Sequence, residues 1–456
     1  MAIWRIMTER KGGSLRRIKT ILMVCMMGIV FEGLPLNDYY AYSQEKGVTS
    51  VLKGNSGSMD FNACVKLALD QSPYFRENAL EIDIRRLGES DSRWAFIPSL
   101  TIRTTSYLGL EDSSGMKLNI FLSEFDPVAS YLTLKASKIF TEIAILIHQK
   151  SIADGIYDMA KKFLELETLG QIVVFQEKVL DQHLENVSFF QARHKAGAVT
   201  QVEVQLAKGQ LAVAQAEREY VSAQQSTIME GLRQFLNMDS SQQLDINLQE
   251  IKHQAVGPRN PADYSLEQAR NRSFELKIHE LKKELQNYKI SQAYARFVPK
   301  LTVGVHQTTD LDATQVDDYY YSLSFRMNLW NGFKDVNDVE RQKIILNQFK
   351  NEMRLVEIEL NTKWQTTQRA LSESEAALKL ARLNQEMLGL KERQTEMNYS
   401  SNKRFLSALL DKRIAHLEAR KDSLMKSLDH DKKVLKIRHL SGDLFGSLIT
   451  VSPTKE

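Results

Sequence analysis

Residues 319–333 of the chain read YYYSLSFRMNLWNGF. Apolar and aromatic side chains fall at every second position from Tyr319 to Leu329, and polar ones lie between them at Ser322, Ser324, Arg326 and Asn328. Because a β-strand turns successive side chains to opposite faces, this alternation predicts a strand. After Trp330, Asn331 and Gly332 the sequence changes to a long, charged, helical pattern. The stretch therefore predicts a strand that runs directly into a helix.

Most of the remaining chain carries helical patterns. It has 8 prolines among 456 residues, and none lies within 128–256 or 300–450. Proline breaks helices, so two such runs predict very long ones. A coiled-coil spacing of 4, 3, 4 and 3 residues is followed by Leu132, Ala136, Ile139, Ile143 and Leu146. A helix over 128–194 would be about 100 Å long, which no compact domain needs.

The helix expected to return after it, near 201–223, has two apolar stripes. One contains Val202, Leu206, Gly209, Val213, Ala216, Tyr220 and Ala223, and the other contains Val204, Ala207, Leu211 and Ala214. Two stripes suit a helix that has a neighbour on each side. An ordinary antiparallel bundle also needs small residues at close contacts, so the pattern leaves both arrangements open.

The chain resembles itself. WAFIPSLTIRTTSYL (94–108) aligns with ARFVPKLTVGVHQTT (295–309) at an offset of 201 residues. LNIFLSEFDP (118–127) aligns with LSFRMNLWNG (323–332) at an offset of 205 residues. We expect two tandem repeats, each with an amphipathic helix (60–95 or 262–296), two strands, a long helix and a shorter returning helix.

Composition excludes several functions. The 60 basic and 57 acidic residues nearly balance, which argues against nucleic acid as a partner. The sequence has no catalytic triad pattern, phosphate loop or metal-binding cluster, and its 9 histidines are scattered. We therefore expect no enzyme activity and no cofactor. The two cysteines, Cys25 and Cys64, do not indicate a compartment.

The N-terminus resembles an export signal. Lys11, Arg16, Arg17 and Lys19 precede the apolar run 21–31, which is too short to span a membrane. Ala41 and Ser43 are small residues suited to cleavage before Gln44. A buried helix is the alternative.

The four predicted strands could enter a membrane if the protein is exported. They would then have to find partner strands in other copies of the chain, because an open sheet edge is not tolerated in lipid and small barrels need about eight strands. A water-soluble sheet packed on the helices remains the alternative.

These features together resemble the TolC-type family of outer-membrane efflux proteins. The resemblance covers nearly all of 58–440. It is carried by the opening MDFNACVKLALDQSPYF, two Phe-x-Pro-x-Leu strand starts at 96–100 and 297–301, the junction LWNGF, and the hairpin ARHKAGAVTQVEVQLAKGQLAVAQAE.

The resemblance implies a mostly α-helical fold with a small membrane β-barrel part. Two tandem repeats would give long antiparallel coiled-coil helices that form a trimeric α-barrel, and four strands per chain would form a shared twelve-stranded barrel. The implied segments are a signal peptide (1–43), an N-terminal periplasmic segment with the first helix (44–95), a strand pair (96–127), a periplasmic hairpin (128–237), an equatorial connector (238–262), a helix (263–296), a strand pair (297–331), a second hairpin (332–440) and a tail (441–456).

The resemblance also implies site residues. Glu203, Tyr399 and Arg404 would form a periplasmic gate, and Asp411 a ring of carboxylates facing the bore. Gly197, Ala198, Val199 and Asn402 would lie at the hairpin tips that contact an adaptor. Trp330, Asn331 and Gly332 would form the strand–helix junction. Three positions depart from the family pattern: Ala408 replaces a second acidic residue, Asn402 a glycine, and Phe125-Asp126-Pro127 lacks the glycine pair.

The implied function is a passive exit duct in the outer membrane with a long periplasmic extension. Its implied partners are two further copies of the chain, outer-membrane lipid, a periplasmic adaptor and an inner-membrane pump, as in tripartite efflux or type I secretion. The alternative is a non-conducting periplasmic coiled-coil adaptor or scaffold. The transported substrate and the pump class do not follow from the sequence.

Overall fold

The computed structural model describes residues 59–96, 100–107, 115–122, 126–239, 244–247, 261–308, 318–326, 332–401 and 406–444. All of them belong to the compact unit Ser58–Glu456. The expected signal peptide, Asn402, Arg404, Trp330 and Asn331 lie outside the described residues.

Four long helices dominate, as the proline-free runs predict. Helix α4 (Pro127–Lys195) has 69 residues and is followed by α5 (Gln201–Phe235) with 35. Helix α8 (Lys334–Ser401) has 68 residues and is followed by α9 (Leu406–Leu440) with 35. At 1.5 Å per residue, α4 and α8 are each about 100 Å long.

The shorter helices differ from the expectation. Instead of one helix over 60–95, the chain forms α2 (Phe61–Gln71) and α3 (Pro73–Trp94). Ser72 is extended because it precedes Pro73, whose ring disfavours a helical residue before it. Over 262–296 the chain forms the short η2 (Pro261–Asp263), α6 (Leu266–Arg272) and α7 (Phe274–Ala295). Here Ser273 is extended and its side chain accepts a hydrogen bond from the Leu276 amide, which starts a new helix.

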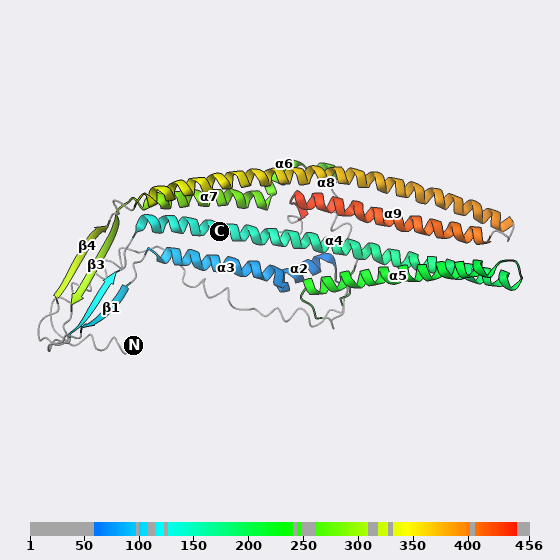
Figure 1. Cartoon of the computed structure of the whole chain (residues 1–456), viewed down its shortest axis with the longest axis horizontal. Helices are drawn as coiled ribbons and strands as arrows, with labels where there is room; N and C mark the ends of the chain where they lie inside the picture. Colours follow the sequence, from blue (N-terminus) through cyan, green and yellow to red (C-terminus); the bar gives the residue numbers. More distant parts are fainter. Residues whose placement is uncertain are drawn as a thin grey trace. The chain divides into compact units, whose positions relative to one another are not determined.

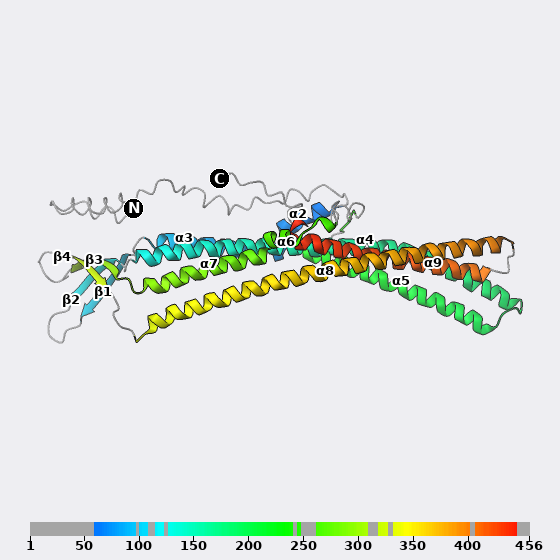
Figure 2. The ribbon, with the colours of Figure 1, turned by 90° about the horizontal axis from the view of Figure 1, so that it is seen from above.

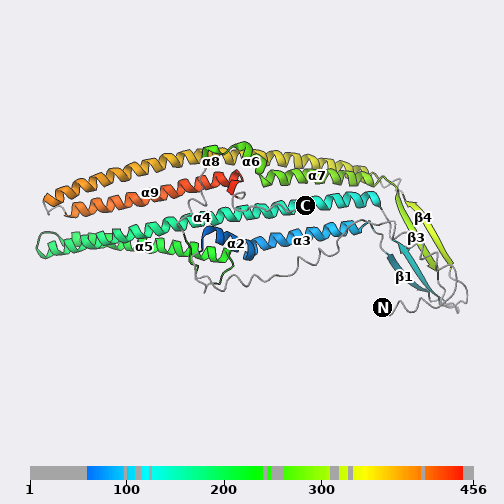
Figure 3. The same ribbon diagram turned by 180° about the vertical axis from the view of Figure 1, so that it is seen from behind.

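The helices pack side by side in a layer that is one helix thick (Figure 1). In the half next to the strands the neighbours are α3, α4, α7 and α8. In the other half, which ends at the hairpin tips, they are α5, α4, α9 and α8, as Figure 3 shows from behind. Helices α4 and α8 therefore run through both halves, and the shorter helices fill the remaining places.

The strands form two antiparallel hairpins at the end opposite the tips (Figure 2). Strand β1 (Leu100–Tyr107) pairs with β2 (Gly115–Leu122), with Ile102 opposite Ile120. Strand β3 (Lys300–Thr308) pairs with β4 (Asp318–Arg326), with Val303 opposite Leu323. Strands β2 and β3 also lie next to each other. The order therefore leaves β1 and β4 as outer strands.

The largest apolar core lies around the middle of α4. Phe163 is fully buried and meets Phe61 of α2 edge to face, with the ring centroids 5.3 Å apart. Phe75 of α3 packs so closely on α4 that a β-carbon at Gly155 would lie 2.6 Å from its ring. The cluster also holds Ile156, Met159, Leu164, Leu232 and Leu435, so it joins α2, α3, α4, α5 and α9.

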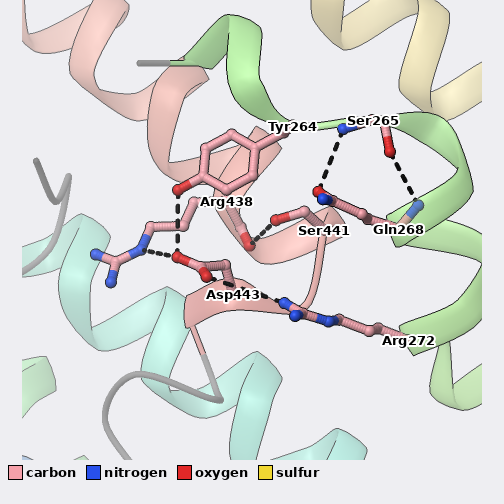
Figure 4. Close-up of polar contacts among 7 residues, drawn as sticks. All are labelled: Tyr264, Ser265, Gln268, Arg272, Arg438, Ser441 and Asp443. Atoms are coloured by element: carbon pink, nitrogen blue, oxygen red, sulfur yellow. Dashed lines mark hydrogen bonds and ion pairs between the residues drawn. The ribbon is translucent and has the colours of Figure 1, made fainter. Parts of the chain in front are cut away.

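A polar network fixes the end of α9 near the apolar core just described (Figure 4). Arg438 is almost completely buried, and its Nε donates to Asp443 Oδ2 at 3.3 Å. The Tyr264 hydroxyl donates to the same oxygen at 3.2 Å, and Arg272 lies 3.9 Å from the other. A buried charge needs such partners, so the network holds the segment around η2 and α6 against the end of α9.

Candidate functional site

The first candidate feature is the free face of α5. Of its two apolar stripes, one is used within the chain, since Val204, Ala207 and Ala214 are buried. The other has 61–72% of each large side chain exposed, and it consists of Val202, Leu206, Val213 and Tyr220. The first three of these line the open groove that α5 forms with α4 and α9. One stripe of α5 is therefore buried within the chain, and the other is uncovered.

A matching uncovered stripe lies on α8, at the other edge of the layer. Its side chains are 45–70% exposed and follow heptad spacing: Leu380, Leu383, Met387, Leu390 and Met397. Nearer the strands, α3 exposes Leu80, Ile84, Leu87 and Trp94, and α8 exposes Val336, Ile344, Leu355 and Ile358. Contiguous exposed apolar surface of this kind marks interaction sites. Both edges of the layer thus lack a partner within the described chain.

The first hairpin tip is a tight turn built by Gly197. Its φ is +72°, which glycine adopts readily, and its amide donates to the His194 carbonyl at 2.9 Å. The Ala198 amide donates to the Arg193 carbonyl at 2.9 Å, which closes the end of α4. Ala198 is exposed and Val199 half-buried. The predicted tip residues of the first hairpin are thus at the turn, and Asn402 of the second lies outside the described residues.

The predicted gate residue Glu203 forms a local cap at the start of α5. Its carboxylate accepts hydrogen bonds from the Thr200 amide at 2.6 Å and the Thr200 hydroxyl at 2.9 Å. These bonds lower the pKa of Glu203 below its usual value. Tyr399 is half-buried near the end of α8, and Arg404 lies outside the described residues. The structure therefore places Glu203 and Tyr399 on different hairpins and leaves the proposed trio untested.

Asp411 is exposed on α9 and lines an open groove between the two hairpins. The groove also contains His183 of α4 and Glu217 of α5, together with Glu418 of α9. Burial lowers the pKa of His183, although Glu418, Asp411 and Glu217 oppose this effect. Ala408, at the position without the expected second acid, is half-buried on the same helix.

The two strand-to-helix junctions use different chemistry. Gly332 has φ +68° and Phe333 φ +64°, directly before α8 begins at Lys334. Two successive left-handed residues turn the chain sharply, and glycine makes the first of them easy. At the other junction Asp126 caps α4 by accepting from the Ala129 amide, and Pro127 occupies the first helical position. This junction therefore starts its helix with an aspartate cap and a proline, and it lacks the glycine pair that the family pattern has at this position.

The described residues include no group of three or more His, Cys, Asp or Glu side chains arranged to hold a metal. Among the helices that the structure describes, none has a long enough apolar run to cross a bilayer.

Sequence reasoning missed one polar contact between the hairpins. Lys421 of α9 donates from Nζ to Glu217 Oε2 of α5 at 2.9 Å. Charge patterns along each helix could not pair them, because they are 204 positions apart and meet only through tertiary packing.

The fold is that of TolC-type outer-membrane channels. It is similar to the Campylobacter jejuni CmeC outer membrane channel, with a TM-score of 0.73, 13% identity, and coverage of 84% of this chain and 85% of that one. It is also similar to the open state of the Neisseria gonorrhoeae MtrE outer membrane channel (TM-score 0.71, 12% identity, coverage 84% and 88%). The Vibrio cholerae outer membrane protein VceC gives a TM-score of 0.65 at 12% identity, with coverage of 82% and 95%. Comparison with protein-family models and with curated sequences gives no match. The resemblance noted from the sequence is thereby confirmed for the fold.

Proposed function

We propose that this protein is an outer-membrane exit duct that works as a homotrimer. The observation that carries the proposal is that α5 and α8, the outermost helices of the layer near the tips, each carry an uncovered apolar stripe. When the α5 edge of one copy packs against the α8 edge of the next, the contact is heterologous and can close into a ring. Three copies would enclose a helical tunnel about 100 Å long.

The strands support the same assembly. Their lengths of 8 and 9 residues are close to the roughly 9–11 residues that a tilted strand needs to cross a bilayer. With β1 and β4 as outer strands, copies could join edge to edge into a closed barrel of twelve strands, which leaves no unpaired edge in lipid. The matched order of elements around Ser72 and Ser273 also supports two tandem repeats within each copy.

The duct would be passive, and it would lie in the outer membrane with the helices in the periplasm. The hairpin tips at Gly197–Val199 and near Asn402 would contact a periplasmic adaptor, and an inner-membrane pump would supply the energy. In a trimer, the three copies of Asp411 would place a ring of carboxylates at the periplasmic entrance of the duct, and this ring would favour cations. Glu203, Tyr399 and Arg404 remain the proposed gate, tested by whether Glu203→Ala or Arg404→Ala raises conductance.

The test is the oligomeric state and conductance of the detergent-extracted protein in planar bilayers. We expect trimers that conduct. Leu206→Asp and Leu390→Asp, one on each edge, should convert trimers to monomers. Val174→Asp is the matched control, because Val174 is also exposed, at 51%, but lies on α4 in the middle of the layer. A monomer without channel activity, recovered from the periplasmic fraction, would instead favour the non-conducting coiled-coil scaffold.

A further inference from the structure

An ion pair between the two hairpins lies away from the tip. At the tip, Glu203 directs its carboxylate to Thr200 of its own turn. Farther from the tip, Lys421 of α9 and Glu217 of α5 form an ion pair with a separation of 2.9 Å. Helices α5 and α9 both pack along α4 but have no extended contact with each other. The pair therefore bridges two helices that are otherwise connected through a third.

The ion pair stands at the point where the hairpins separate. On one side is a small pocket bounded by α4, α5 and α9, lined by Gln176, Glu217, Glu418 and Lys421 among others. On the other side is the open groove, which again contains Glu217 and Glu418 and extends to Val202 at the start of α5. Figure 2 shows the hairpins α4–α5 and α8–α9 running apart toward their tips.

The surroundings make Lys421 important for this contact. Glu217, Glu418 and Asp411 line the two cavities, and Lys421 is the only lysine or arginine among their lining residues. Without it, carboxylates from α5 and α9 would face one another and repel. His183 does not supply a bond, since its Nδ1 is buried without a hydrogen-bond partner.

Buried polar groups without partners lie near the pair. Gln176 of α4 lines the pocket and is 4% exposed, but neither polar atom of its side-chain amide has a partner. Asn186, closer to the tip, is also buried with an unpartnered Oδ1. Such groups oppose close packing. The apolar cluster at this level, in which Leu424 of α9 packs against Leu169, Ile172 and Val221, is smaller than the core around Phe163.

We propose that the Glu217–Lys421 ion pair is a positioning contact that holds the α8–α9 hairpin against the α4–α5 hairpin, and that the duct opens when it breaks. This inference rests on the proposed function as a conducting duct. It assigns to two residues outside the tip a role that the Glu203 cap leaves unfilled.

The test compares charge reversals in planar bilayers. Lys421→Glu and Glu217→Lys should each raise open-state occupancy about two- to fivefold, as expected for losing an exposed ion pair. The double variant with both changes restores an opposite-charge pair and should return occupancy to the wild-type level. The matched control is Arg218→Glu, because Arg218 and Glu177 form a 3.0 Å pair of similar exposure between α5 and α4 of one hairpin. This control should leave occupancy unchanged.

Three outcomes would overturn the inference while leaving the duct intact: single reversals without effect, a double variant that fails to restore closure, or a control that opens the duct equally. A second measurement avoids reliance on charge. Cross-linking Glu217→Cys with Lys421→Cys by a short bis-maleimide should lower conductance, whereas the Glu177→Cys and Arg218→Cys pair should not. A wild-type protein that forms no trimers and never conducts would instead reject the proposed function itself.

Discussion

The two halves of α4 differ in the side chains that they bury. Near the middle of the molecule α4 presents Ile156, Met159 and Phe163, which are 0–1% exposed in a continuous apolar core. Toward the tip it presents Gln176, His183 and Asn186, each with a buried polar atom that lacks a partner. One uninterrupted helix therefore has a half in the largest apolar core, here called the firm half, and a half with unpaired buried polar groups, here called the weak half. On the proposal above, movement between the hairpins would begin at the tip and stop at the apolar core.

The charged contacts follow the same division. Near the core, α9 is attached to α4 by Lys432–Glu165 at 2.6 Å and His439–Asp154 at 3.1 Å, beside tightly packed apolar side chains. Toward the tip, Lys421–Glu217 stands next to an open groove. An ion pair beside a packed core adds little, since the core already fixes the helices. On the proposal above, the same pair beside a groove would decide whether they stay together.

The largest expected effect concerns the firm half. Phe163→Ala removes a fully buried ring and should lower the free energy of unfolding by about 3–5 kcal/mol. Phe175→Ala, on the same helix in the weak half, should cost clearly less, because Phe175 is only half-buried beneath the Arg420 guanidinium. Thermal unfolding followed by circular dichroism measures both. Equal costs would contradict the division into two halves.

Two glycines of α4 offer a second comparison. Gly155→Ala would place a β-carbon 2.6 Å from the Phe75 ring, and overpacking should cost about 1–3 kcal/mol. Gly170→Ala has its nearest neighbour, Gln225 Nε2, 4.0 Å away, so it should stabilise the helix by about 0.5–1 kcal/mol. Opposite shifts of the unfolding temperature are expected. If Gly155→Ala also stabilises, the close contact with Phe75 is wrong.

Buried glutamines give a third comparison. Gln176→Leu should stabilise the weak half by about 1–3 kcal/mol, because it removes an amide without hydrogen bonds. Gln286→Leu should destabilise, since the Gln286 amide donates to the Gln342 carbonyl at 2.9 Å and to its side chain at 2.8 Å. Thermal unfolding followed by circular dichroism distinguishes the two variants. Stabilisation by Gln176→Leu together with reduced conductance would further indicate that the weak seam serves opening.

The smallest expected effect is a pH dependence at His183. Burial sets the pKa of His183 in the folded protein below its ordinary 6.5. The unfolded chain then binds the proton more readily, so stability is complete above pH 6.5 and declines as the pH falls toward the folded pKa. The loss should stay below about 1 kcal/mol, because the ring is partly open to water. Unfolding at pH 8 and pH 5 should differ less in His183→Gln than in wild type; an equal difference would assign the pH dependence to other groups.

Much of the fold follows from local patterns. The absence of proline over 128–256 and 300–450 predicted long helices, which the structure shows as α4, α5, α8 and α9, and the alternation around Leu323 predicted β4. The breaks at Ser72 and Ser273 were missed, although the proline after Ser72 is a known signal for one. The second break has no proline and depends on a serine cap.

The candidate site was less predictable. The sequence showed two apolar stripes on α5, but only the structure shows that Val204 is buried within the chain while Val202 is left uncovered. Glu203 was assigned to a gate by resemblance, and its bonds to Thr200 give it a local structural role as well. The pattern of charges cannot reveal which helix faces which, so Glu217 and Lys421 were overlooked.

The sequence alone determined most of the secondary structure and its order, because helix length, strand alternation and turn residues depend on interactions between near neighbours in the chain. The tertiary structure decided which apolar stripe is buried, which edges remain uncovered and which charges meet. Those outcomes depend on the register between helices that lie far apart in the sequence, as Asp154 of α4 and His439 of α9 do, and no local preference fixes that register.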